Sequence, residues 1–303
     1  MPILSRRVLL VALATVLAVL AGLVLIQLLR PRAAVGLNPP TTLPTPSASA
    51  EVLLAVGDIG SCERQSDEAV AALAAGLPGA IALLGDIAYE KGTTAEFRRC
   101  FEPAWGPMQP RFHPVPGNHE YETPGASAYF DWFGAEAGTP GEGWYSFELG
   151  AWHLVALNSN CGLVGCGAGS PQLAWLEADL AAHPSTCLLA FWHHPRYSSG
   201  RHGSIPGTDA LWDALVAQGL DVALAGHDHS YERVAADGAR EFVVGTGGRS
   251  LYAFEHGPIP ETEVRHTGNY GLLWLALAPD SYEWQFLSLG TPDFTDTGSG
   301  DCA

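Results

Sequence analysis

Two apolar runs that both end in Gly-Asp, with a helical segment between them, constrain the fold of this chain more than any other feature. The runs VLLAVGD at residues 52–58 and AIALLGD at residues 80–86 have the length and composition of buried strands. Between them, residues 66–76 predict a helix with Ser66 as its N-cap and Gly76 as its stop signal. A strand, a helix and a second strand in this order are expected to form a parallel, right-handed unit.

Beyond this unit, helices and strands continue to alternate before strands come to dominate the C-terminal part. Two more helices are expected at residues 170–183 and 208–219. Further strands are expected at residues 111–120, 143–159 (a hairpin), 187–194, 221–229, 240–248, 270–279 and 281–289. This order of elements predicts a layered α/β sandwich that contains two mixed sheets.

The N-terminal part has a different character from the rest of the chain. Residues 8–29 carry no charge, and as a helix these 22 residues would be ~33 Å long, enough to cross a bilayer. We expect residues 1–30 to be an uncleaved membrane anchor, or alternatively a cleaved export signal, and SRRVLL at residues 5–10 resembles a twin-arginine signal. Residues 31–50, rich in Pro, Thr, Ser and Ala, predict an extended linker. The folded domain is therefore expected at residues 51–303.

The cysteines favour an extracytoplasmic location. The chain has six, none in a CxxC pair, and an even number behind an export segment is typical of disulfides. The expected pairs are Cys62 with Cys100, Cys161 with Cys166, and Cys187 with Cys302. Six cysteines allow 15 pairings, and six reduced thiols in a cytosolic domain are the alternative.

The folded part of the chain is strongly acidic, which argues against polyanionic partners. The net charge of the whole chain is −17, and residues 1–50 contain four arginines and no acidic residue. Residues 51–303 therefore hold 32 acidic residues against 11 basic ones. Because binding to phosphates needs clustered Lys and Arg, no nucleic acid partner is expected.

Five predicted strand ends carry side chains of the kinds that bind metals. In chain order these are Asp58, Asp86 with Tyr89, Asn118 with His119, His193 with His194, and His227 with His229. The carboxyl ends of parallel strands meet at one edge of a sheet. Taken alone, an Asp could cap a helix and a Tyr could belong to the core. Together, these oxygen and nitrogen donors predict a centre for Fe, Mn or Zn.

These motifs resemble those of the calcineurin-like metallophosphoesterases. They read GDIG, GDIAY, GNHE, FWHHP and GHDH, in that family's order, within residues 51–290. Many members have Asp-x-His in the first motif, whereas this chain has Gly60 there and Tyr89 three residues after Asp86. That pattern resembles the purple acid phosphatase branch. The resemblance implies a four-layer α/β/β/α sandwich and a binuclear centre at which a metal-bound hydroxide attacks the phosphorus of a phosphate monoester.

The resemblance also implies how the side chains divide between two metal ions. The first ion is expected to bind Asp58, Tyr89 and His229, the second Asn118, His193 and His227, with Asp86 bridging both. A phenolate and carboxylates stabilise Fe(III), so the first ion is expected to be ferric and the second Fe(II), Zn or Mn. His193 is expected to be the ligand rather than His194, because it ends the apolar strand and matches the family position.

Two further histidines are candidates for catalytic roles. His119 follows the ligand Asn118, and His202 follows His193 by nine residues, as the family's outer catalytic histidine does. Either could bind the substrate or protonate the leaving oxygen; for His202 the alternative is a plain surface histidine. The remaining histidines, which fit no motif and are expected to be structural or surface residues, are His113, His153, His183, His256 and His266.

We therefore expect a metallophosphoesterase catalytic domain at residues 51–303, membrane-anchored or secreted. Its partners are expected to be a phosphate-ester substrate and, through residues 8–29, a membrane. A phosphodiesterase acting on nucleotides or phospholipid headgroups at the same site is the first alternative, since the metal motifs do not distinguish the two. A metal-binding surface module without activity is the second, and the complete ligand set disfavours it.

Overall fold

The computed structural model describes residues 40, 43–63, 66–290 and 293–302. All of these belong to the unit formed by residues 35–303. The predicted anchor or signal and most of the predicted linker lie outside the described residues. Within the residues that are described, no helix is long and apolar enough to cross a bilayer.

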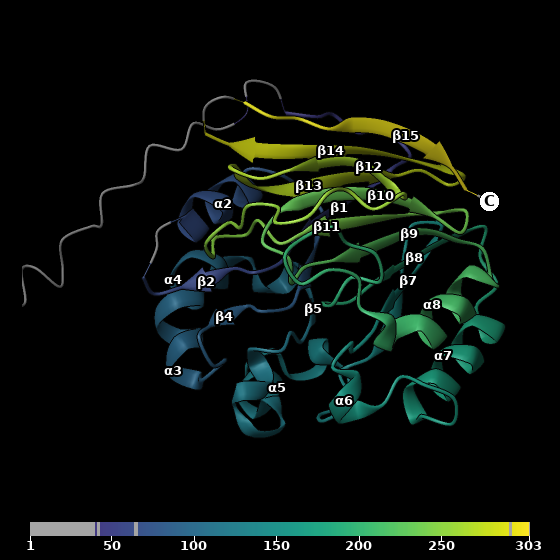
Figure 1. Ribbon diagram of the computed structural model, residues 1–303, viewed down its shortest axis with the longest axis horizontal. Helices are drawn as coiled ribbons and strands as arrows, with labels where there is room; N and C mark the ends of the chain where they lie inside the picture. The colour runs from purple at the N-terminus through teal and green to yellow at the C-terminus, as the bar shows by residue number, and fades with distance from the viewer. Residues whose placement is uncertain (1–39, 41–42, 64–65, 291–292, 303) are drawn as a thin grey trace, which may run out of the picture. The chain divides into compact units, whose positions relative to one another are not determined.

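The first of two large sheets has six strands and contains the predicted parallel unit (Figure 1). Its order is β15 (Thr297–Asp301), β14 (Ser281–Leu289), β13 (Tyr270–Leu277), β1 (Glu51–Val56), β3 (Ala80–Leu84) and β5 (Phe112–Val115). The strands β1, β3 and β5 are parallel, whereas β13, β14 and β15 are antiparallel additions. After the exposed Glu51, the residues of β1 are all apolar and buried, as expected of a strand that is covered on both faces.

The second sheet has seven strands and is also mixed. Its order is β12 (Thr262–His266), β10 (Tyr231–Ala236), β11 (Ala239–Val244), β9 (Leu220–Ala225), β8 (Cys187–Phe191), β7 (Trp152–Ala156) and β6 (Tyr145–Leu149). The central strands β11, β9, β8 and β7 are parallel. The hairpin of β6 and β7 turns at residues 150–151, as the sequence predicts. A small pair, β2 (Gly60–Ser61) with β4 (Ala88–Tyr89), lies at the ends of β1 and β3.

Helices cover the outer faces of both sheets. They are α2 (Ser66–Ala75), α3 (Thr94–Glu96), α4 (Glu102–Trp105), α5 (Ser127–Phe133), α6 (Cys161–Val164), α7 (Pro171–Ala182) and α8 (Asp209–Val216). The short helical segments between residues 94 and 133 were not expected, because prolines and glycines interrupt any helical periodicity there. Ser66 is the first residue of α2 rather than its N-cap, since its hydroxyl donates to Gly248 O at 2.6 Å.

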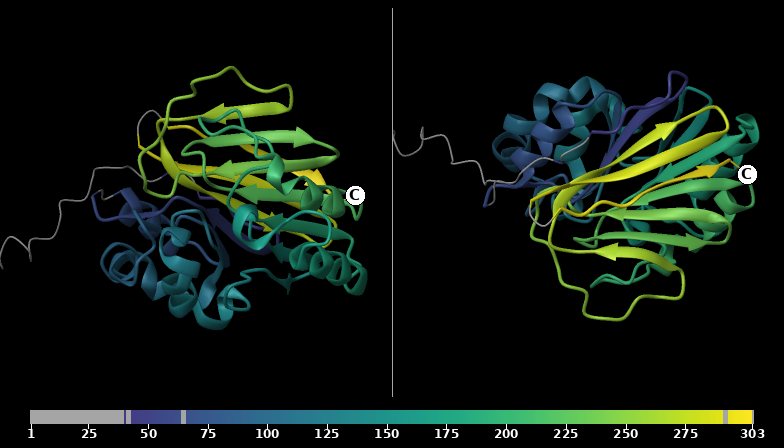
Figure 2. Two further views of the ribbon diagram at one scale, coloured as in Figure 1. Left: turned by 60° about the horizontal axis from the view of Figure 1, so that its bottom comes forward. Right: turned by 90° about the horizontal axis from the view of Figure 1, so that it is seen from above.

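Three apolar clusters hold these layers together. One lies between the two sheets and includes Leu53, Leu189 and Leu275. A second packs α2, α4 and α5 on the six-stranded sheet. A third packs α7 and α8 on the seven-stranded sheet (Figures 1 and 2). The chain is thus a mixed α/β fold in which two large sheets face each other between layers of helices.

All three cysteine pairs expected from the sequence are joined in the structure. Cys62 bonds to Cys100, Cys161 to Cys166, and Cys187 to Cys302, with Cα–Cα distances of 4.7, 5.1 and 5.2 Å. The third bond connects the start of β8 to the residue after β15, so it ties the two sheets together.

Candidate metal centre

The ends of the parallel strands from both sheets meet at one place, where the predicted ligands gather. Asp58 and Asp86 follow β1 and β3 of the six-stranded sheet, while His193 and His227 follow β8 and β9 of the other. The two sheets are in direct contact here. Asp58 Oδ2 accepts a hydrogen bond from His227 N–H at 2.9 Å, and His193 Nδ1 lies 2.8 Å from Leu84 O. The centre is therefore built between the sheets at their common edge.

The first predicted ligand set converges around the hydroxyl of Tyr89. This hydroxyl donates to Asp58 Oδ1 at 2.8 Å and to Asp86 Oδ2 at 3.0 Å. It also lies 3.2 Å from His229 Nε2, which is 3.1 Å from Asp58 Oδ1. His229 Nδ1 lies 2.6 Å from Ser250 O, a contact that turns Nε2 toward the centre. All four side chains of this set are buried.

The second predicted set converges around His193 Nε2. That nitrogen lies 3.4 Å from Asp86 Oδ1, 3.2 Å from Asn118 Oδ1 and 3.2 Å from His227 Nδ1. The two oxygens of Asp86 thus face different sets, Oδ2 the first and Oδ1 the second. This is the arrangement that a bridging carboxylate needs.

Three of these residues adopt a backbone conformation that is uncommon outside glycine. Asp58, Asp86 and His227 have φ values of 60°, 49° and 69°. Asp and His occur in this left-handed region more often than most residues, and such conformations cluster at functional sites. Each of the three directly follows a glycine at the end of a strand, so the turn aims the side chain inward at once.

The ionisation of the buried side chains fits a site that binds cations. Burial raises the pKa of Tyr89 well above its ordinary value, and the negative charges of Asp58 and Asp86 act in the same direction. Burial alone would raise the pKa of Asp86, but His193 lowers it below its usual range. Burial lowers the pKa of His227, and the positive charge of His193 adds to this effect. The lowered pKa favours the neutral, metal-binding form of His227, whereas the pKa of His193, which burial would lower, is raised to about 9 by Asp86, so His193 would have to lose a proton to bind a metal ion.

The donor set passes a direct test of fit to two metal ions. The phenol proton of Tyr89 stands between two buried carboxylates, at a position where a cation could take its place. Carboxylate, phenol, amide and imidazole donors match the preferences of Fe, Mn and Zn. One ligand atom from each of Asp58, Asp86 and His193 lies within 4.8 Å of the others. The two oxygens of Asp86 face different groups of donors.

Gly60 stands at the position of the first motif where many calcineurin-like metallophosphoesterases have a histidine. A Cβ atom at Gly60 would lie 2.8 Å from Ile87 O, because β2 pairs with β4 at this point. No side chain fits there without a shift of the backbone. The hydroxyl of Tyr89, on β4, supplies a donor beside Asp58 instead.

Glu120 is a further residue of the centre that was not predicted from the sequence. Its side chain is fully buried and accepts hydrogen bonds from the backbone N–H groups of Asp86, Ile87, Ala88 and Gly117 at 2.8–3.2 Å. Burial and the nearby Asp86 raise the pKa of Glu120 to about 7, while the four donors favour its ionised form. Glu120 therefore ties the strand end that carries Asp86 to the strand end that carries Asn118. The sequence did offer one indication of this role. Glu120 ends the GNHE motif, and a Glu that directly follows predicted metal-binding residues is a candidate for orienting them.

Replacing Glu120 with glutamine should weaken metal binding by ~10–100-fold, the usual effect of losing a group that orients metal ligands. The glutamine amide presents donors where the carboxylate presents an acceptor, so at least one backbone N–H group loses its partner. Metal retention in a graded series of chelator concentrations measures the effect. The exposed neighbour Glu122→Gln is the matched control. Equal retention in both variants would show that Glu120 does not position Asp86.

Three further histidines, His119, His194 and His202, lie beside the predicted ligands. The rings of His202 and His227 are 4.3 Å apart, and His202 is exposed. His119 is tied to Asp86, since its N–H donates to Asp86 Oδ1 at 2.9 Å, and its Nδ1 lies 2.5 Å from Glu90 O. His194 Nδ1 lies 2.9 Å from Ser159 Oγ. His202 and His119 are thus adjacent to the ligands, as their proposed roles require.

The loop that carries His202 is held in place by Asp228, the middle residue of GHDH. Asp228 Oδ1 accepts from His202 N–H at 2.8 Å, and Oδ2 accepts from Ser198 Oγ at 2.6 Å. A Cβ at Gly200 would lie 2.2 Å from the carboxyl carbon of Asp228, so the loop approaches this carboxylate too closely for any side chain there. Asp228 is therefore a positioning residue that the sequence analysis did not single out.

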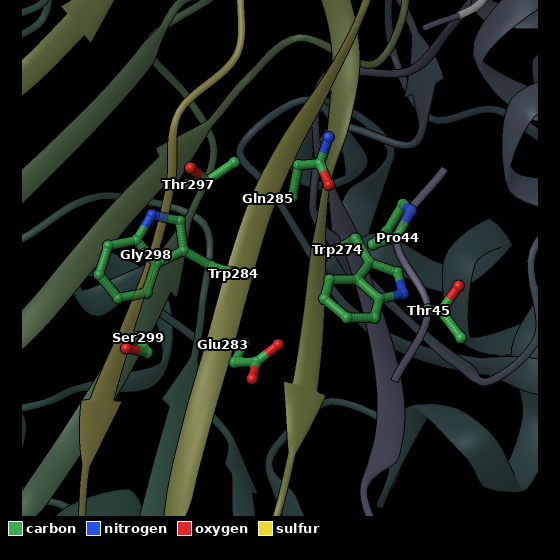
Figure 3. Close-up of a pocket in the computed structure, with 9 residues that line it drawn as sticks. All are labelled: Pro44, Thr45, Trp274, Glu283, Trp284, Gln285, Thr297, Gly298 and Ser299. Atoms are coloured by element: carbon green, nitrogen blue, oxygen red, sulfur yellow. The ribbon is translucent and has the colours of Figure 1, made fainter. Parts of the chain in front are cut away.

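A cavity on the outer face of the six-stranded sheet contains none of the predicted site residues. It has a volume of about 430 Å³ and lies where Pro44 and Thr45 run beside Trp274, on β13, with Glu283 and Gln285 on β14 (Figure 3). Its lining offers neither histidine nor cysteine, so it lacks the donors of the candidate centre.

Comparisons with known proteins agree with the geometry of the centre. Residues 52–231 match the profile of the calcineurin-like phosphoesterase family. Purple acid phosphatase 15 of Arabidopsis thaliana is 27% identical over 262 residues, which cover 71% of this chain and 48% of that protein. This chain spans about half the length of the curated relatives it matches first.

Solved structures show the same fold. A purple acid phosphatase from yellow lupin seeds superposes with a TM-score of 0.73 at 17% identity, covering 84% of this chain and 55% of that chain. The protein GAP50, described as the anchor in the inner membrane complex of Plasmodium, superposes with a TM-score of 0.70 at 13% identity and covers 84% of this chain and 90% of that chain. At 17% and 13% sequence identity, these two matches show that the fold is shared and nothing more.

Proposed function

This chain belongs to the calcineurin-like phosphoesterase family, in its purple acid phosphatase-like branch, and its folded domain is that of a metal-dependent phosphoesterase; we propose that it hydrolyses phosphate monoesters at a centre of two metal ions. The observation that carries the proposal is the position of Asp86. One of its oxygens faces Tyr89 and the other faces His193, and each of these is surrounded by further donors. A single carboxylate placed between two donor sets is what a pair of adjacent ions requires.

The two donor sets differ in chemistry, and this difference supports a different ion in each. Asp58, Tyr89 and His229 offer anionic oxygens that favour Fe(III), whereas Asn118, His193 and His227 offer neutral donors that suit Fe(II), Zn or Mn. When bound, the ions would supply Lewis-acid chemistry and offset negative charge on the phosphoryl oxygens. Asp86 would keep them close together by bridging. The buried Glu120 and Ser250 O hold these ligands in place before the substrate arrives.

His202 is the residue best placed to donate a proton to the leaving oxygen. Its ring lies beside His227 on the exposed side of the centre, and it can exchange protons with water. Asp228 accepts from its backbone N–H and so holds the loop that carries this ring beside the site. His119 is closer to the ligands and bonds to Glu90 O, which suits it to orient the substrate rather than to exchange protons with solvent.

Purified full-length protein, loaded with metal in detergent, tests the proposed reaction. We expect p-nitrophenyl phosphate to be hydrolysed with a higher kcat/KM than bis-p-nitrophenyl phosphate, and chelation to remove activity with both. A preference for the diester would favour the phosphodiesterase alternative at the same site. Metal-loaded protein that is inactive on both substrates would support a non-catalytic metal-binding module.

Replacing Tyr89 with phenylalanine should bleach the iron-loaded protein while leaving partial hydrolysis. A phenolate bound to Fe(III) gives a charge-transfer band in the visible range, and this substitution removes only the oxygen atom. The ring can still pack in its buried position. The measurement is the visible spectrum of protein reconstituted with iron under oxidising conditions, so that a colourless Zn or Mn form does not confuse the result.

The matched control for Tyr89 is Tyr252→Phe. The ring of Tyr252 stacks on His229 with centroids 4.1 Å apart, so it borders the same centre without belonging to the proposed ligand set. We expect this variant to keep the band. Iron in both sites without any tyrosinate band in the unaltered protein would remove Tyr89 from the ligand set. The remaining metallophosphoesterase motifs would not be affected by that result.

A further inference from the structure

Four polar side chains form a second cluster at the far end of β7 from the candidate metal centre. His153 is the second residue of β7, and Glu148 is its cross-strand partner on β6. Asp179 lies in the last turn of α7, and His183 follows that helix. The candidate centre, in contrast, is approached from the opposite, C-terminal ends of β8 and β9. We call Glu148, His153, Asp179 and His183 the β7–α7 cluster.

His153 is the centre of this cluster and is 1% exposed. Its Nδ1 lies 2.7 Å from Glu148 Oε1, and its Nε2 lies 2.8 Å from Asp179 Oδ2. His183 Nδ1 lies 3.3 Å from Asp179 Oδ1, and the two imidazole rings stack at 5.0 Å with an angle of 15° between them. One ligand atom from each of His153, Asp179 and His183 lies within 4.8 Å of the others.

The contacts of His153 match the way proteins prepare a histidine to bind a metal. A ligating imidazole usually gives its other N–H to a carboxylate, which fixes the tautomer and the ring orientation. Glu148 is placed to accept that bond from Nδ1, and this leaves Nε2 directed at Asp179. Ser146 Oγ donates to Asp179 Oδ1 at 2.7 Å and so orients the second carboxylate.

The positions of Asp179 and His183 also favour a shared ligand. They are four residues apart at the end of α7, so their side chains leave the same face. In a tetrahedral zinc site with bonds of ~2.0–2.2 Å, neighbouring ligand atoms are ~3.3–3.6 Å apart. The 2.8 Å between His153 Nε2 and Asp179 Oδ2 is a hydrogen-bond distance, so these two atoms would have to move slightly apart, and His183 Nδ1, which also lies 2.9 Å from Asp179 O, would have to leave that contact. The side chain of His183 is 49% exposed, which leaves one side of the cluster open to water.

We propose that His153, Asp179 and His183 bind a Zn²⁺ ion that is separate from the candidate metal centre. Two imidazoles and a carboxylate suit Zn²⁺, and water would complete a tetrahedral site. The ion would take the place of the hydrogen bond between His153 Nε2 and Asp179 Oδ2, and the proton of that bond would be released to water. It would connect the β6–β7 hairpin to the end of α7, so its role would be to stabilise this end of the fold.

Zinc content of the purified full-length protein tests the proposal. We expect His183→Ala to bind one equivalent of Zn²⁺ fewer than the unaltered protein, or to bind it ~10-fold or more weakly. The substituted side chain is half exposed, so the variant should fold. His256→Ala, which removes an exposed histidine outside every motif, is the matched control and should bind as the unaltered protein does. Anomalous diffraction at the zinc edge would locate the ion between the three ligands.

The experiment separates this site from the proposed function. In an Asp86→Ala background the candidate centre should lose metal, and the Zn²⁺ equivalent that depends on His183 should remain. Zn²⁺ at a concentration a hundredfold above its Kd should also raise Tm by about 5 °C, and His183→Ala should reduce that rise. Equal zinc stoichiometry and affinity in His183→Ala and His256→Ala would overturn the proposal, whatever the activity of the enzyme.

Discussion

Replacing Asp86 with alanine should abolish hydrolysis and remove at least one metal ion from the candidate centre. Both donor sets lose a carboxylate oxygen at once, since Oδ2 faces Tyr89 and Oδ1 faces His193. Losing a group that only orients a ligand typically costs 10–100-fold in metal affinity or activity, so losing the bridge itself should lower kcat/KM by at least ~10³-fold. Metal analysis and the rate of p-nitrophenyl phosphate hydrolysis, measured on the same preparation, check both parts.

The variant Asp86→Asn distinguishes the effect of the negative charge of the Asp86 carboxylate from the effect of the shape of its side chain. It preserves one oxygen that can accept from His119 N–H, so the turn after β3 should hold, yet it removes the negative charge between the ions. We expect Asp86→Asn to retain more metal than Asp86→Ala and to remain strongly impaired in turnover. Full metal content together with unchanged turnover in either variant is incompatible with a bridging carboxylate at this position.

Replacing His202 with alanine should lower kcat by ~10²–10⁴-fold and leave both metal ions bound. This range is the typical effect of losing a positioned acid or base. The metal content should not change, because His202 meets the proposed ligands only through its ring contact with His227. Steady-state kinetics on metal-loaded protein, with metal content determined in parallel, give the result.

Two further variants help to interpret a loss of activity in His202→Ala. His256→Ala removes another exposed histidine and should leave kcat unchanged. Asp228→Asn should weaken the anchor of the His202 backbone without removing the imidazole, so we expect a smaller fall in kcat than with His202→Ala. If His202→Ala loses a metal ion, His202 is a ligand and the assignment of His193 must be revised. If it keeps full activity, His202 is a surface residue.

Much of the candidate centre could be predicted because its residues lie in short local motifs. Asp58, Asp86 and His227 each follow an apolar strand and a glycine, and such a pattern is visible without any long-range information. Parallel strands deliver their C-terminal residues to one edge, so local patterns suffice to bring distant residues together. The short helical segments between residues 94 and 133 were not predicted, because their geometry depends on packing against α2 and β5 rather than on a periodic pattern in the sequence.

The sequence by itself determined the strand ends, the kinds of candidate ligand they carry and the parallel order of β1 and β3, because each of these is encoded within a few neighbouring residues. Only the tertiary structure decided which groups hold those ligands in place. Glu120 reaches backbone N–H groups up to 34 positions away, and Asp228 accepts from His202, 26 positions away. His153 meets Asp179 across 26 positions, although neither belongs to a motif. Hydrogen bonds between such distant residues depend on how the layers pack, and no local pattern of apolar and polar residues records that packing.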